Sequence, residues 1–523
     1  MPPRTPDLAV PDRPPARPGS ADVRGRADAL LSGTLAFVIS VLGAGRPSLW
    51  VDEAATVSAT DRPLPELWRL LHSVDAVHGL YYLLLHGWSA LTPSGELWLR
   101  LPSAVLVGVA AAGVAVLGRQ LSTRSVSLAA AVVFALLPRT TWAGIEARPY
   151  ALTMACAVWL TVLLIVAIRR GSVGLWAAYG LGLIASVGVN VMVLLIVVPH
   201  AVLVIGAAPT RRARTAWMTT VAAAAPAVVA LVVILAGQQG QVSWIWPVGP
   251  VTAGQIFAEQ YFPSVYSDSV RAVGPGRQQF TAEQLAVAVR AWVRVVPLIS
   301  LVIVLAVVAV WKRHRGTAVI PTGARLLVAV SVTWILAPTV LLVGFSAFVR
   351  PLYQPHYLAF STPAVALLIG LGVVVVGRDH RRIGVILALL AVAAAPNYLA
   401  QRGPYAKYGS DYSQVAGVLA AHSAPGECLS VVGADSGSTA DGLEGARLVH
   451  RDRLIDIGTD ESARQRDSLF GSRLPDHERP IGDCAVVWVV TAAADGRPAA
   501  PGFRVQQQWQ FNQSTVAKEV RVR

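Results

Sequence analysis

The stretch that decides the fold reads "ALLSGTLAFVISVLGAGR" (29–46) and continues, after one proline, as "SLWVDEAAT" (48–56). The first part is apolar over nearly the ~20 residues that a membrane-spanning helix needs. The second part places Asp52 and Glu53 beside Trp50, directly after that span. Spans usually end in Trp, Tyr, Lys or Arg at the membrane interface, so the two acids indicate something other than anchoring.

The composition supports a membrane protein. Of the 523 residues, 54% are hydrophobic and only 14% are charged, whereas a soluble domain carries about 25% charged residues. The chain therefore cannot cover a soluble surface and predicts an integral membrane protein with several spans. The net charge of +14 is divided into short basic clusters between apolar stretches. We therefore expect the clusters to set topology, and we expect no nucleic-acid partner.

Eleven apolar segments have lengths close to that of a span: 29–46, 101–118, 125–138, 149–168, 172–189, 190–208, 215–236, 293–311, 326–348, 358–377 and 383–398. The connectors between them alternate in charge. One set is basic and comprises the N-terminal tail, 118–125, 169–172, 211–216, 312–316 with Arg325, and 377–382. The positive-inside rule makes this set cytoplasmic. The other set, which holds 48–56, 139–150, 237–292 and 350–357, then faces outward together with the C-terminal region.

These assignments predict three parts. Residues 1–28, rich in Pro, Arg and Asp, are predicted to be a disordered cytoplasmic tail. Residues 29–400 form the transmembrane domain, with a first outer loop at 48–100 and a second large one at 237–292. Within the first loop, "HGLYYLLLHGWSALT" (78–92) is short and aromatic, so we expect two helices along the membrane surface within 60–95.

Residues 401–523 predict a small extracytoplasmic α/β domain. Its apolar runs have the length of strands: "CLSVV" (428–432), "ARLVH" (446–450) and "CAVVWVV" (484–490), whereas 413–423 reads as an amphipathic helix. Cys428 and Cys484 open two of these runs. If this region lies outside the cytoplasm, a disulfide between them is possible, because disulfides persist in oxidising compartments. Two buried free thiols are an equal alternative.

Polar side chains of a particular kind gather where the outward connectors meet the spans. They are Asp52, Glu53, Asp75, His78, Tyr81, Glu96, Arg100, Glu146, Arg148, Tyr150, Arg350, Tyr353, His356 and Tyr357. If the helices bundle, these residues converge on one cavity at the outer surface. Carboxylates facing cations suit a reaction that moves a proton and releases an anion.

Each candidate also has an ordinary explanation. Asp52 and Glu53 would form a solvated helix end that helps to fix the membrane topology. Acidic residues contribute little to topology, so this explanation accounts poorly for their position. Glu146 and Arg148 would form a surface ion pair worth about 0–1 kcal/mol. His78 would orient a carboxylate, ligate a metal or pack at the interface. Arg100 would lie beside a lipid headgroup, and Arg350 and His356 would either bind phosphate or extend to the interface.

Taken together, the outer motifs resemble the GT-C glycosyltransferases, and among them the family 39-like protein mannosyltransferases, bacterial aminoarabinose transferases and actinobacterial mannosyltransferases. The resemblance is strongest over about residues 30–170 and is carried by "LWVDEAAT" (49–56), "DAVHGLYYLLLHGW" (75–88), "ELWLRLPSA" (96–104) and "GIEARPYAL" (144–152). It implies a GT-C fold and a polyprenyl-phosphate-linked sugar as donor. It also implies Asp52 as catalytic base and Glu146 beside the acceptor or the donor sugar.

This sequence departs from the family pattern at two places. Many relatives have Arg-Tyr where this chain has His356-Tyr357, so Arg350 would supply the cation. Many relatives also have a Thr-His-Tyr-like stretch near residue 190, where this chain reads "GVNVMV" (188–193). Members differ in metal use, so a divalent cation held by Asp52, Glu53 and His78 stays open.

The predicted function is transfer of a sugar to an acceptor hydroxyl on the outer face, with inversion. Mannose is favoured by the resemblance, and a pentose donor stays open. The acceptor would be a glycolipid, a polysaccharide or a protein. Two alternatives are a lipid transporter and a non-catalytic cell-envelope scaffold. A transporter should carry ionisable groups near the bilayer midplane, where this sequence has almost none.

Overall fold

The computed structural model describes residues 20–208, 210–238, 240, 243–266, 282–433, 436–492 and 499–522. The chain divides into two compact units. The first comprises Met1–Leu42, Leu101–Ser264 and Val293–Tyr398, and the second comprises Gly43–Arg100, Val265–Trp292 and Leu399–Arg523.

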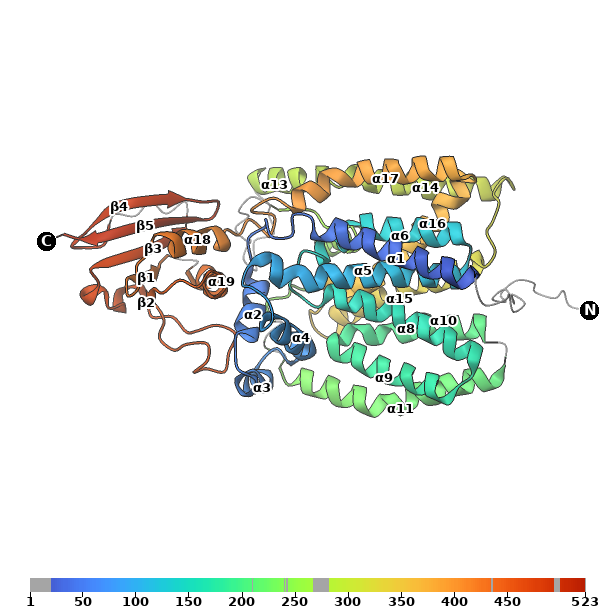
Figure 1. Cartoon of the computed structure of the whole chain (residues 1–523), viewed down its shortest axis with the longest axis horizontal. Helices are drawn as coiled ribbons and strands as arrows, with labels where there is room; N and C mark the ends of the chain where they lie inside the picture. The colour runs from blue at the N-terminus through green and yellow to red at the C-terminus, as the bar shows by residue number, and fades with distance from the viewer. Residues whose placement is uncertain are drawn as a thin grey trace, which may run out of the picture. The chain divides into compact units, whose positions relative to one another are not determined.

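Helices dominate the first unit, as Figure 1 shows. Among the described residues, seven helical segments are long and apolar enough to cross a membrane: α5 (Glu96–Leu121), α8 (Tyr150–Arg170), α11 (Arg211–Ala236), α14 (Val296–His314), α15 (Ala324–Phe348), η5 with α16 (Pro355–Gly377) and α17 (His380–Gln401). Three shorter apolar segments accompany them: α6 (Arg124–Leu136), α9 (Val173–Val189) and η2 with α10 (Val191–Ala207). Together with α1 (Ser20–Val41), these helices coincide with the eleven predicted apolar segments.

The first helix begins earlier than the sequence predicts. α1 starts at Ser20, so the predicted disorder is wrong for residues 20–28, whereas residues 1–19 lie outside the described part of the chain. The extension has a physical reason. Asp28 accepts hydrogen bonds from Arg119 (2.9 Å) and Arg124 (2.8 Å), which fasten this turn to neighbouring helices.

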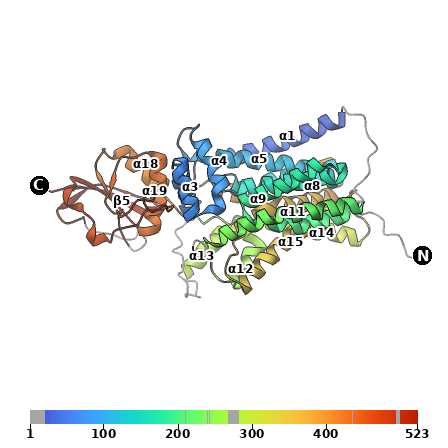
Figure 2. The same ribbon diagram turned by 90° about the horizontal axis from the view of Figure 1, so that it is seen from below.

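Glycines allow several helices of the first unit to approach closely. A Cβ atom on Gly33 of α1 would lie 2.9 Å from the carbonyl oxygen of Gly108 in α5. A Cβ on Gly370 of α16 would lie 2.5 Å from the backbone nitrogen of Ala130 in α6. Small residues at such crossings let the helix backbones pack closely. In lipid, where there is no hydrophobic driving force between helices, this van der Waals packing holds them together. Figure 2 shows α8, α9 and α11 packed side by side in the same unit.

Short helical pieces form the remaining connectors of the described chain. They are α7 (Pro138–Ala143), α12 (Pro250–Gly254), the π-helical turn η4 (Gln255–Glu259) and α13 (Ala282–Val293).

The second unit starts with short helices. These are α2 (Val51–Thr60), α3 (Leu64–Ser73), η1 (Ala76–His78) and α4 (Gly79–Ser89). α3 has 10 residues and α4 has 11, about half of what a span needs. α3 buries Leu67 and Leu70 and exposes Trp68, a pattern typical of helices that lie in the membrane interface.

A five-stranded mixed sheet forms the C-terminal part of this unit. Its strands are β1 (Cys428–Val431), β2 (Ile455–Asp456), β3 (Val486–Ala492), β4 (Phe503–Gln510) and β5 (Ser514–Arg521), in the order β2-β1-β3-β5-β4. β1 is parallel to β2 and β3, and β5 is antiparallel to β3 and β4. A disulfide joins Cys428 to Cys484. Two short 3₁₀ turns, η6 (Asp476–Glu478) and η7 (Ile481–Asp483), precede β3.

Two helices complete the second unit: α18 (Tyr412–His422) and α19 (Ser436–His450). The predicted strand at 446–450 is wrong, because these residues form the last turn of α19. That helix packs against α2, and a Cβ on Gly445 would lie 2.5 Å from Ala54. The predicted fold class, a polytopic helical membrane protein with a small C-terminal α/β domain, is confirmed.

Candidate active site

Asp52 and Glu53 occupy the first turn of α2. Trp50 is the N-cap residue, in an extended conformation and with no side-chain hydrogen bond to the helix end. Acidic side chains in a first helical turn are stabilised by the helix dipole. Asp52 is half-buried, whereas Glu53 is completely buried. The two neighbouring acids therefore have different surroundings.

Arg100 holds Glu53 with a two-pronged ion pair. Its Nε donates to Oε1 of Glu53 at 2.8 Å and its Nη2 donates to Oε2 at 2.6 Å, and neither side chain is exposed. The other N–H groups donate to the carbonyls of Ala44 (2.8 Å), Pro47 (2.8 Å) and Ser48 (3.0 Å). All five guanidinium donors thus have acceptors. Arg100 therefore fixes both Glu53 and the bend of chain that leads into α2.

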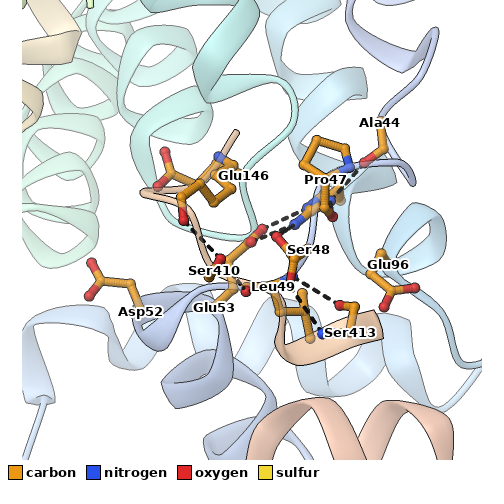
Figure 3. Close-up of polar contacts among 12 residues, drawn as sticks. Ala44, Pro47, Ser48, Leu49, Asp52, Glu53, Glu96, Glu146, Ser410 and Ser413 are labelled. Carbon is orange, nitrogen blue, oxygen red and sulfur yellow. Dashed lines mark hydrogen bonds and ion pairs between the residues drawn. The ribbon is translucent and has the colours of Figure 1, made fainter. Parts of the chain in front are cut away.

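Serine hydroxyls from the C-terminal segment hold the residues just before α2. The Leu49 amide donates to Ser413 Oγ at 3.0 Å, and the Ser413 amide donates to Ser48 Oγ at 3.1 Å. Ser410 Oγ lies 2.9 Å from the Leu49 carbonyl oxygen. Figure 3 labels Ser48, Leu49, Ser410 and Ser413 in this cluster. The rings of Trp50 and Tyr408 are 5.0 Å apart. This serine clamp (Ser48, Ser410 and Ser413) spans more than 360 positions of sequence.

Lys407 lies in the same C-terminal segment, and its side chain is completely buried. Ser410 Oγ lies 2.8 Å from the Lys407 carbonyl oxygen, and the same hydroxyl reaches the Leu49 carbonyl. A buried ammonium is costly unless charge or hydrogen bonds compensate for it. Lys407 is not among the residues predicted from the sequence, because a single lysine after the last span carries no signal of its own.

His78 is oriented by a neighbouring carboxylate. Its Nε2 lies 3.8 Å from Oδ1 of Asp75, and Tyr82 donates a hydrogen bond to Asp75. Asp75, His78 and Tyr81 are all buried. Among the residues that the structure describes, no group of three His, Cys, Asp or Glu side chains could hold a metal ion.

Glu146 and Arg148 belong to the first unit, in the turn between α7 and α8, and both are buried. Ser103 Oγ donates to the Glu146 carbonyl at 2.7 Å. Steric packing also holds this turn, because a Cβ on Gly144 would lie 2.6 Å from Ser40 Oγ. These two contacts help to place Glu146.

Aromatic contacts join the two outer motifs of the first unit. Tyr150 lies at the start of α8, and its ring is 5.1 Å from that of His356. The His356 ring is 4.9 Å from that of Tyr357 in η5. The structure therefore brings Tyr150, His356 and Tyr357 together. Arg350 is half-buried and lies six positions before His356 in the chain.

A buried hydrogen-bond network fixes the neighbouring outer segment. Tyr353 donates to Gln260 Oε1 at 3.0 Å, Gln260 donates to the Tyr261 hydroxyl at 2.7 Å, and Arg139 Nε donates to the Gln260 carbonyl at 2.9 Å. Burial raises the pKa of Tyr261 to about 12, so this phenol stays protonated at neutral pH. The sequence predicted Tyr353 as a site candidate, whereas the structure gives it this supporting position.

No protein-family model matches the sequence, and no curated protein matches it. Among solved structures, ArnT from Cupriavidus metallidurans in the apo state is similar at 12% identity and a TM-score of 0.49, over 96% of this chain and 98% of that chain. The Archaeoglobus fulgidus oligosaccharyltransferase is similar at 12% identity and 0.47, over 89% and 68%. Arabinosyltransferase EmbB from Mycobacterium smegmatis is similar at 16% identity and 0.38, over 70% and 32%.

All three similarities have TM-scores below 0.5. At identities this low, the activity of this chain is inferred from its own residues.

Proposed function

We propose that this protein transfers a sugar from a polyprenyl-phosphate donor to an acceptor hydroxyl at the outer membrane surface, with Asp52 as general base. The observation that carries the proposal is the setting of Asp52. It lies in the first turn of a helix whose entry is fixed by the Glu53–Arg100 pair and by the serine clamp. A catalytic carboxylate must be held in place by groups that are themselves fixed.

The proposed reaction balances as one displacement. The Asp52 carboxylate takes the proton of the acceptor hydroxyl while that oxygen forms a bond to the anomeric carbon. The bond from this carbon to the phosphate oxygen breaks, and its electron pair leaves with the lipid phosphate. Attack opposite the leaving group inverts the anomeric configuration. The phosphate monoester leaves as an anion and needs cations rather than a proton.

The roles of the other residues follow from their contacts. Glu53 and Arg100 satisfy each other, so we assign them to positioning Asp52 rather than to holding substrate. His78, oriented by Asp75, and Tyr81 would contact the sugar.

Arg148, Arg350 and His356 are proposed to stabilise the leaving phosphate, with Tyr150 and Tyr357 packed around His356. Glu146 is proposed to position a sugar hydroxyl. Lys407 is a further candidate for the phosphate charge, because it is a buried cation near the entry to α2.

The orientation proposed from the basic connectors is that the N-terminus is cytoplasmic and that Asp52 and residues 401–523 are extracytoplasmic. The Cys428–Cys484 disulfide supports this orientation, because disulfides persist on the oxidising side of the membrane. The donor sugar is proposed to be mannose on the resemblance of the outer motifs.

The test is transfer by isolated membranes supplied with labelled polyprenyl-phosphate-mannose, comparing wild type with Asp52→Asn. Loss of general-base catalysis should lower turnover by about 10²–10⁴-fold without lowering the amount of folded protein. Asp460→Asn, on an exposed loop, serves as the matched control and should retain activity. Near-normal transfer by Asp52→Asn would reject Asp52 as base. A parallel assay with polyprenyl-phosphate-arabinose decides between a hexose and a pentose donor.

A further inference from the structure

A cavity of about 260 Å³ opens in the second unit, away from the first turn of α2. Its walls come from the last turns of α2, α4 and α19 and from the loop 90–95. The polar lining residues used below are Thr60, Asp61, His86, Ser89, Ser94 and Arg451. Drug-sized ligands occupy pockets of about 300–1,000 Å³, so this volume suits one sugar ring rather than a long chain.

The polar groups of the cavity include both donors and acceptors. His86 Nδ1 lies 3.0 Å from the Thr60 carbonyl oxygen. A carbonyl can only accept, so Nδ1 carries the hydrogen, and Nε2 of the neutral ring is an acceptor. The Asp61 carboxylate adds acceptors, the Arg451 guanidinium adds donors, and the Ser89 and Ser94 hydroxyls serve as either. Asp61, Ser89, Ser94 and Arg451 are all exposed. Such a mixed set matches the hydroxyl groups of a neutral carbohydrate.

The helix directions argue against an anionic ligand. Three helices end at the cavity, α2 at Thr60, α4 at Ser89 and α19 at His450, and one helix, α5, begins there at Glu96 with an acidic side chain in its first turn. Helix C-termini carry partial negative charge and present carbonyl groups that lack intrahelical partners. Phosphates prefer the opposite end of a helix. The cavity therefore favours a ligand that donates hydrogen bonds over a lipid phosphate.

The cavity also lies at a definite distance from Asp52. Thr60 follows Asp52 by eight positions of the same helix, which corresponds to a rise of about 12 Å. A short oligosaccharide spans that distance and a single sugar ring does not. We propose, on the basis of the function proposed above, that this cavity binds a distal sugar unit of the acceptor. The acceptor is then an oligosaccharide or polysaccharide rather than a polypeptide.

The test uses the full-length protein in lipid nanodiscs with labelled donor and a graded set of acceptors. The acceptors are methyl mannoside, mannotetraose, the corresponding arabinosides, and a Ser/Thr-rich peptide. Ser89→Trp fills the cavity, and Leu91→Trp is the matched control, because Leu91 is 84% exposed on the same loop and does not line the cavity. Loss of a few hydrogen bonds predicts that Ser89→Trp lowers kcat/KM for the tetrasaccharide by about 10–100-fold. The methyl glycoside should be unaffected, and Leu91→Trp should behave as wild type.

Binding provides a second readout that does not depend on catalysis. Asp52→Asn protein should bind the tetrasaccharide in saturation-transfer NMR, and adding Ser89→Trp to it should abolish the signal. One outcome would overturn the cavity assignment and keep the base assignment. In that outcome Asp52→Asn abolishes transfer, but the wild-type protein does not prefer longer acceptors and Ser89→Trp does not change its transfer. Efficient transfer to the peptide would overturn the cavity assignment as well. If Asp52→Asn protein is active and still binds the tetrasaccharide, the role of Asp52 as base is rejected and the cavity assignment stands.

Discussion

The described contacts differ between the two acidic segments of this protein, around Asp52 in the second unit and around Glu146 in the first. Around Asp52 they include charge and hydroxyl groups: the Arg100 guanidinium binds Glu53, and serines from the far end of the chain hold Leu49. Around Glu146 they include the close packing of Gly144 and one serine hydroxyl. We call the first the charge-anchored segment and the second the packing-anchored segment, and we expect loss of a buried charge partner to destabilise the first and added volume at Gly144 to destabilise the second.

The largest expected effect is on the charge-anchored segment. Glu53→Gln leaves the Arg100 charge buried without its anion, and breaking a buried ion pair costs about 3–5 kcal/mol. We therefore expect a large drop in the melting temperature of the purified protein, measured by thermal unfolding in detergent. Asp379→Asn removes one partner of the exposed Asp379–Arg382 pair and should cost less than about 1 kcal/mol. Equal effects of the two variants would contradict the charge-anchored description.

The packing-anchored segment should respond to a single added methyl group. Gly144 has φ −71°, which alanine adopts freely, so the cost of Gly144→Ala is steric. Its Cβ would meet Ser40 Oγ at 2.6 Å, and overpacking of this kind costs about 1–3 kcal/mol. Combining Gly144→Ala with Ser40→Gly removes the clash and should restore most of the loss, apart from the helix penalty of glycine. A double-mutant cycle of unfolding temperatures checks this, and additive losses would rule out the contact.

Much of this fold could be predicted from the sequence, because spans are recognisable from length and hydrophobicity alone. The contacts that hold the site could not. Arg100 and Glu53 are 47 positions apart, and Leu49 and Ser413 are 364 apart, so no local pattern joins them. The strand predicted at 446–450 is a helix because Leu443 and Ala446, three positions apart, are both buried, as on one face of a helix. Gly442 and Gly445 obscured that signal, because glycine lowers helix propensity.

Single serines should have smaller and similar effects in the two segments. Ser413→Ala removes the acceptor of the Leu49 amide, and Ser103→Ala removes the donor to the Glu146 carbonyl. Each buried hydrogen bond is worth about 1 kcal/mol, so we expect comparable decreases in the free energy of unfolding by denaturant titration. Ser73→Ala, at an exposed position, is the control and should have almost no effect. A much larger loss in Ser413→Ala would show that the serine clamp acts as a cooperative unit.

The smallest effect concerns pH and only the segment around Asp52. α19 packs on α2, and burial raises the pKa of Asp441 in α19 to about 6. The folded state therefore binds this proton more tightly than the unfolded chain does, whose carboxyl titrates at about 4. Stability should rise as pH falls from above 6 toward 4, by on the order of 1 kcal/mol after solvent screening. Melting temperatures at pH 4.5 and 7.5 measure this change, and Asp441→Asn should reduce it, because burial also raises the pKa of Asp411 and Glu444 and leaves part of the dependence. An unchanged pH dependence in that variant would assign the titration to another group.

The contact between Gly445 and Ala54 also determines when α2 can complete its packing during synthesis of the chain. Asp52 leaves the ribosome 384 residues before Ser436, the first residue of α19 (436 − 52). At about 5–20 residues per second of synthesis, the helix that carries Asp52 waits roughly 20–80 s for the helix that covers it. During that interval α2 is exposed on the side that Gly445 later covers. The proposed activity should therefore begin only after nearly the whole chain has been made. An interrupted translation product that holds every candidate membrane helix should still lack the helix that covers α2.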